Sequence, residues 1–179
     1  MMPERLKGET LLKVVTIIVI VIGALTIAGG AISYLSSSLT VSMLGLSASA
    51  GGVYKLIGAI STVSGIVVII VGILGYKWRK DIENAVMIII LAIVYIVSHV
   101  IFGNISGNLN ASIEKQVNDA IIATMPEMQG IMESDLVTSA TVMPVDPMTI
   151  VCLVLSILMI VGALLNKSTK PIASDPIQM

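Results

Sequence analysis

The side chains of this sequence that could do chemistry are few, and the first is its single histidine, His99. Tyr95 precedes His99 by one helical turn, so both side chains share one face of an apolar segment. An ionisable group at membrane depth is a candidate functional group. We therefore expect an intramembrane polar site at Tyr95 and His99. This site would either bind a proton or a ligand, or make a structural hydrogen bond.

A polar region follows that segment and contains regularly spaced methionines and aliphatic residues. Clustered thioethers can bind Cu(I), but methionines more often fill packed or adaptable apolar surfaces. We expect no metal site and predict a surface for packing or for partner binding. Its residues are Ile113, Val117, Ile121, Met125, Met128 and Met132.

The remaining reactive groups do not indicate an enzyme. Cys152 is the only cysteine, which excludes an intrachain disulfide and a cysteine-based metal site within one chain. The sequence has no phosphate-binding glycine loop and no pattern that marks a nucleophile, so we expect neither catalysis nor a cofactor. Asn104 and Asn110 begin acceptor patterns for N-glycosylation. The net charge of −1 argues against a nucleic-acid surface.

Long apolar segments must position these residues. The chain is 56% hydrophobic and 12% charged, whereas a soluble domain has about 25% charged residues. We predict an all-α integral membrane four-helix bundle with an amphipathic helical outer loop between the third and fourth helices. The expected transmembrane helices are residues 11–35, 51–76, 84–103 and 148–165. The segments between and around them are the N-terminus 1–10, a short outer loop 36–50, a turn 77–83, a large helical outer loop 104–147 and a tail 166–179.

The cations predict how the chain is oriented in the cell membrane. Eight of the ten Lys and Arg residues lie at or just after the N-terminus, in the 77–83 turn, or in the tail. The 104–146 region, by contrast, carries six carboxylates and only Lys115. The positive-inside rule therefore places both termini in the cytoplasm.

Small residues recur every seven positions along the first two predicted helices. Such a repeat keeps one stripe of a helix facing its neighbour, and small side chains let membrane helices approach closely. We expect the two helices to pack along this seam. Its residues are Thr16, Gly23, Gly30, Gly58, Ser61, Gly65, Gly72 and Gly75.

The layout resembles that of the tetraspanins, in which the first outer loop is short and the second is long. The similarity is most detailed from Gly65 through Gly72 and Gly75 to the polar turn containing Glu83, because tetraspanins have a similar glycine-spaced second helix and a turn with a glutamate. The large loop here lacks the Cys-Cys-Gly motif of that family. The resemblance implies a membrane organiser that binds partner proteins laterally.

Two functions remain open from the sequence. The first is a non-enzymatic scaffold or accessory subunit, with membrane lipids and either a membrane-protein partner or a second copy of the chain as its partners. This protein would also use the 104–147 loop for binding. The alternative is a small transporter, channel or energy-coupling subunit that uses His99 and Tyr95.

Overall fold

The computed structural model describes residues 7–44, 48–124 and 147–167, which form four helices and the turn between two of them. The helices are α1 (Glu9–Leu44), α2 (Ala48–Trp78), α3 (Ala85–Thr124) and α5 (Pro147–Lys167). No strand occurs among the described residues, which confirms the all-α fold class. Each helix is long and apolar enough to cross a membrane, so the chain is a multi-pass membrane protein.

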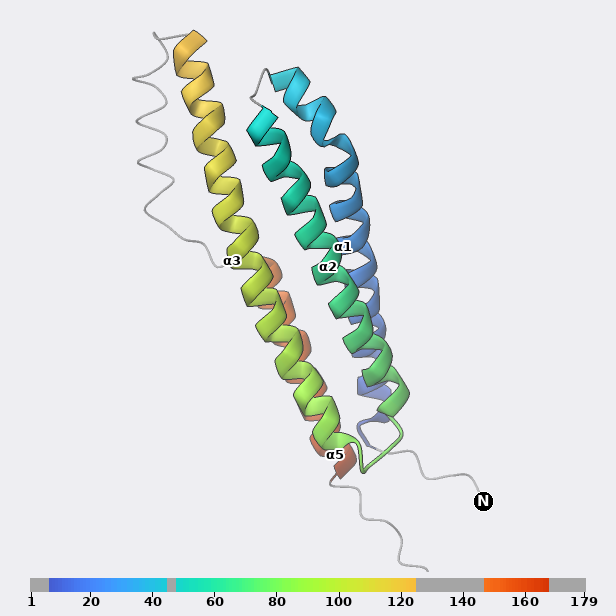
Figure 1. The fold of residues 1–179 in the computed structure, drawn as a ribbon. Helices are drawn as coiled ribbons and strands as arrows, with labels where there is room; N and C mark the ends of the chain where they lie inside the picture. Colours follow the sequence, from blue (N-terminus) through green and yellow to red (C-terminus); the bar gives the residue numbers. More distant parts are fainter. Residues whose placement is uncertain (1–6, 45–47, 125–146, 168–179) are drawn as a thin grey trace, which may run out of the picture.

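The helices alternate in direction, and successive helices pack side by side (Figure 1). α1 packs mainly against α2, α2 against α3, and α3 against α5, and α5 returns to α1. One end of the bundle brings together Gly8, the 79–84 turn and Asn166. Lys7 precedes Gly8, and Arg79 and Lys80 belong to that turn, so we call it the basic end. The opposite end carries the end of α1, the start of α2 and the last turns of α3.

Glycines let the backbones of α1 and α2 approach closely. A Cβ atom on Gly30 would lie 2.7 Å from the carbonyl oxygen of Gly58, and a Cβ on Gly58 would lie 2.7 Å from that of Gly30. Gly23 and Gly65 oppose each other in the same way, at 3.0 and 2.8 Å. The four glycines thus form two reciprocal pairs at the predicted seam, where no larger residue fits without moving a backbone.

The other predicted seam residues have different surroundings. A Cβ on Gly72 would meet Ile20, and one on Gly75 would meet Thr16 at 2.8 Å and Met159 at 3.4 Å. Gly75 therefore lies where α1, α2 and α5 come together. Ser61 lies on α2 too, but it lines a pocket between the helices.

The predicted short outer loop at 36–50 is mostly helical, because α1 continues to Leu44 and α2 begins at Ala48. The serine-rich sequence led to that prediction, since serine hydroxyls often compete with helical hydrogen bonds. Here the hydroxyls bond within the helix instead. Ser37 Oγ donates to the Tyr34 carbonyl at 2.8 Å, and Ser42 Oγ donates to that of Leu39 at 2.9 Å.

The helix that contains the predicted third span does not end at residue 103, since α3 continues to Thr124. Gly103 and Gly107 do not interrupt it, and no proline lies between residues 85 and 124. The predicted loop 104–147 is therefore helical in its first half and continuous with the membrane helix. Its residues 125–146 lie outside the described part of the chain.

The helix lengths indicate how the bundle relates to a bilayer. The 21 residues of α5 span about 31 Å, close to the roughly 30 Å of a hydrocarbon core. The 40 residues of α3 span about 60 Å. α3 consequently extends well past the start of α5 at the opposite end, as Figure 1 shows.

Candidate functional site

A pocket of about 170 Å³ lies between all four helices, near the start of α5 and away from the basic end. Hydroxyl groups and one imidazole make up most of its polar lining. These side chains are Thr26 of α1, Ser61 and Ser64 of α2, and Tyr95, His99 and Ser106 of α3. Among the described residues, no charged side chain lines the pocket.

The predicted pair Tyr95 and His99 lines the pocket, and both side chains reach across to α5. Tyr95 is fully buried, and its hydroxyl lies 3.2 Å from the Cys152 sulfur. His99 Nε2 lies 3.2 Å from the hydroxyl of Thr149. Cys152 and Thr149 are one turn apart on α5, so two polar contacts join α3 to α5 at this level. Neither Cys152 nor Thr149 was assigned to this site from the sequence.

Three serines of the pocket make no hydrogen bond within the described protein. Several other hydroxyls donate to a carbonyl of their own helix, as Thr26 does to Ile22 at 2.8 Å, whereas the buried Ser156 hydroxyl also has no partner. Ser61, Ser64 and Ser106 have no hydrogen-bond partner among the described residues. Ser64 is only 9% exposed, but its Oγ is not fully buried, so a molecule in the pocket can reach it. The pocket is therefore equipped to bind a hydrogen-bonding group.

Apolar side chains close the pocket towards the basic end. On α3, Ala92 and Ile88 lie about one and two turns from Tyr95 and are fully buried. On α5, Leu155 and Met159 follow Cys152 at the same spacing and are 6% and 0% exposed. We call these four residues the apolar plug. They belong to one continuous core with Val19 and Val71, so the polar pocket is a dead end within this chain.

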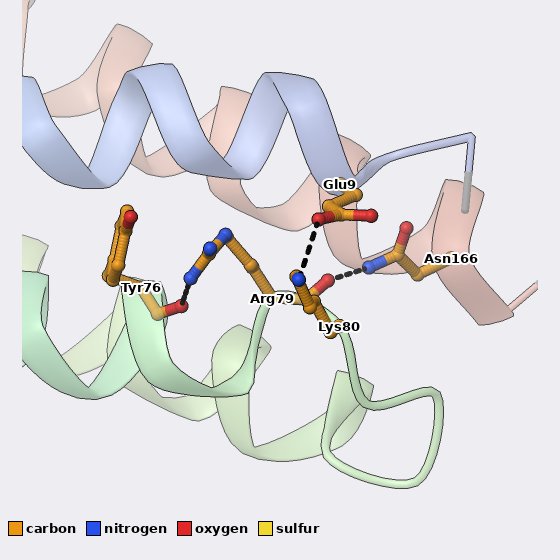
Figure 2. Close-up of polar contacts among 5 residues, drawn as sticks. All are labelled: Glu9, Tyr76, Arg79, Lys80 and Asn166. Carbon is orange, nitrogen blue, oxygen red and sulfur yellow. Dashed lines mark hydrogen bonds and ion pairs between the residues drawn. The ribbon is translucent and has the colours of Figure 1, made fainter. Parts of the chain in front are cut away.

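A second polar cluster joins three segments at the basic end (Figure 2). Asn166 is fully buried; its side-chain oxygen accepts from the Gly8 amide at 2.9 Å, and its nitrogen donates to the Arg79 carbonyl at 2.7 Å. Lys80 and Glu9 form an ion pair at 3.8 Å nearby. This cluster fixes the start of α1, the 79–84 turn and the end of α5 to one another.

Arg79 itself turns back onto α2. Its Nη1 donates to the Tyr76 carbonyl at 2.6 Å, and its guanidinium lies 3.7 Å from the centre of the Tyr76 ring (Figure 2). An arginine over an aromatic face gains a cation–π attraction in addition to the hydrogen bond. The side chain therefore supports the end of α2, while its backbone carbonyl binds Asn166.

The predicted partner surface is only partly described. Ile113 is 5% exposed, so it is packed inside the protein and is not part of an open surface. Val117 is half-buried. The side chain of Ile121, like Met125, Met128 and Met132, lies outside the described part. Asn104 and Asn110, the two predicted glycosylation positions, are exposed on α3.

The fold and this site define a four-helix membrane protein with an interhelical polar pocket. No family model, no curated protein and no solved structure matches the chain.

Proposed function

We propose that this protein is a non-enzymatic membrane scaffold or accessory subunit of tetraspanin-like organisation, which binds partner membrane proteins laterally and through the 104–147 region. The continuous α3 helix is the observation that carries this proposal. It joins the membrane-spanning part to residues 104–119, most of which have exposed side chains. A partner bound to a rigid helix does not have to order a flexible segment, which lowers the cost of association.

The α1–α2 pair supplies the rigid frame for this role. Its two reciprocal glycine pairs, Gly23 with Gly65 and Gly30 with Gly58, hold the backbones in close contact. Under the positive-inside rule, the cations of the basic end favour a cytoplasmic location for that end and for both termini. The extension of α3 then lies outside the cell membrane, where it can meet a partner or a second copy of the chain.

The test is recovery of a stoichiometric partner from the native membrane in a mild detergent, followed by quantitative mass spectrometry. Changing Val117 to Asp places a charge on the half-buried face of α3 beyond the start of α5. We expect the amount of partner recovered with this variant to fall at least tenfold. Glu114→Gln, on an exposed position of the same helix segment, is the matched control and should keep it. Equal recovery with both variants would contradict binding through this region.

The alternative function is a small transporter, channel or energy-coupling subunit. It is favoured by the pocket, because Tyr95 and His99 both line it. The apolar plug opposes it, since apolar side chains fill most of the way from the pocket to the basic end. The buried Ser156 hydroxyl lies at this level, but it has no hydrogen-bond partner with which to form a relay.

His99→Ala separates the two functions. We expect it to cost about 1 kcal/mol of stability through the lost Thr149 contact, and to leave proton flux into proteoliposomes unchanged. A pH-sensitive dye inside the vesicles measures that flux. A wild-type flux that disappears in His99→Ala, but persists in Thr26→Val, would favour the transporter.

A further inference from the structure

A second hollow lies next to the polar pocket, between α2 and α3. It is a groove of about 310 Å³ whose lining is apolar apart from Ser98. The Ser98 hydroxyl is already bonded to the Tyr95 carbonyl at 2.9 Å. The apolar lining consists of Val67, Ile93, Val94, Val97, Ile101 and Phe102.

Phe102 connects the two hollows, since its side chain lines both. Elsewhere, adjacent residues of one helix line different hollows. On α2, Val67 lines the groove and Val68 lines the pocket. On α3, Ser98 lines the groove and His99 lines the pocket. The groove therefore follows the α2–α3 boundary. The polar pocket lies next to it, on the side of the bundle interior.

The two linings together define the chemistry of an occupant. The hydroxyls of Ser61, Ser64 and Ser106 are accessible and have no partner in the described protein, so a group rich in hydroxyls can both donate to them and accept from them. A charged group would have no counter-ion, because no charged side chain lines the pocket among the described residues. At about 170 Å³ the pocket is below the 300–1,000 Å³ usual for a drug-sized ligand, so it suits a small head group.

We propose that the pocket and the groove bind one uncharged membrane amphiphile of the acylglycerol type. Its hydroxyl-bearing head occupies the pocket beside Ser61 and Ser64. Its acyl chain follows the α2–α3 groove and passes Phe102. This binding is separate from the scaffold role, which does not depend on it.

The probe is a monoacylglycerol with a photoreactive diazirine in its acyl chain, added to the purified protein in phosphatidylcholine nanodiscs. After irradiation, peptide mapping should place the label on α2 and α3 residues of the groove. Unlabelled monooleoylglycerol should compete. Methyl oleate, which has the chain but no polyol, and glycerol, which has the polyol but no chain, should not.

The variants test the head group separately from the chain. Changing Ser61 and Ser64 together to Ala removes two hydrogen bonds and should weaken labelling on the order of tenfold. The matched control is Thr62→Val, next to Ser61 on α2 but outside both linings, because its hydroxyl donates to the Gly58 carbonyl. Labelling should be unchanged there. Resistance of the sole cysteine, the 2%-exposed Cys152, to maleimide reports that each variant is folded.

A pocket-filling variant keeps the test independent of the serines. Gly103 lines the pocket, and a Cβ there would meet no atom within 4 Å, so Gly103→Leu can fold and place its side chain in open space. It should abolish labelling. Full labelling in both this variant and the double serine variant would overturn the proposal. Competition by methyl oleate would show a non-selective lipid groove, and competition by glycerol would show a site for free polyols; either result would also overturn it.

Discussion

Replacing Gly30 with leucine is expected to separate α1 from α2 and to open the bundle, while the same change at the adjacent Gly29 leaves it closed. A Cβ at Gly30 would lie 2.7 Å from three α2 atoms: the Gly58 oxygen, and the backbone nitrogen and hydroxyl oxygen of Thr62. Two of these are backbone atoms and cannot rotate away. A Cβ at Gly29 would meet nothing within 4 Å.

The magnitude follows from the kind of clash. Overpacking a filled core costs about 1–3 kcal/mol, and a clash with backbone belongs at or above the upper end. Leucine also has a higher helix propensity than glycine by up to about 1 kcal/mol, so Gly29→Leu should be neutral or slightly stabilising. The two variants have the same composition and nearly the same depth, and they differ only in the face they occupy.

Maleimide labelling of Cys152 measures the difference. This sole cysteine is 2% exposed, so it reacts when the helices part. A loss of about 3 kcal/mol should raise the labelling rate by roughly a hundredfold in Gly30→Leu, at about 1.4 kcal/mol per factor of ten. Equal rates in the two variants would mean that the close approach of Gly30 and Gly58 does not hold α1 and α2 together.

The seam and the helix count were predictable because they depend on local patterns. Hydropathy alone locates four spans, and the seven-residue spacing of small residues indicates which faces can approach. Sequence also placed Tyr95 and His99 on one face, because their separation of one turn is fixed by helix geometry. Each of these features is set within a single helix.

The ends of the helices were not predictable in the same way. Serine is compatible with both a loop and a helix. It is accommodated in a helix when its hydroxyl can donate to a carbonyl of the preceding turn, as those of Ser37 and Ser42 do. The pocket was missed for a different reason. Its character comes from Ser61, Ser64 and Ser106 lacking partners, and that depends on how two helices are spaced across the bundle.

Asn166 is the clearest residue that sequence analysis missed. It stands at the start of the predicted tail and reads as one more polar residue outside the membrane. In the structure it is fully buried and bonds to Gly8, 158 positions away in sequence. Such a contact exists only after α1 and α5 have packed, so no local pattern indicates it.

Asn166→Leu is expected to destabilise the basic end strongly. The change keeps the number and branching of the side-chain heavy atoms but leaves the buried Gly8 amide and the part-buried Arg79 carbonyl without a partner. Each unsatisfied group costs about 1–3 kcal/mol, so the total loss should be roughly 2–6 kcal/mol. Unfolding of the purified protein in mixed micelles, followed through Cys152 labelling, measures this loss.

Lys80→Ala is the matched control, because it removes the other interaction of the same cluster (Figure 2). The Lys80–Glu9 ion pair is 3.8 Å long, and the lysine side chain is 64% exposed. Exposed pairs of this kind contribute between zero and about 1 kcal/mol, so this variant should unfold nearly as the wild type does. If Lys80→Ala cost as much as Asn166→Leu, surface charge would hold the basic end together. If only Asn166→Leu unfolds, one buried amide joins the start of α1, the 79–84 turn and the end of α5.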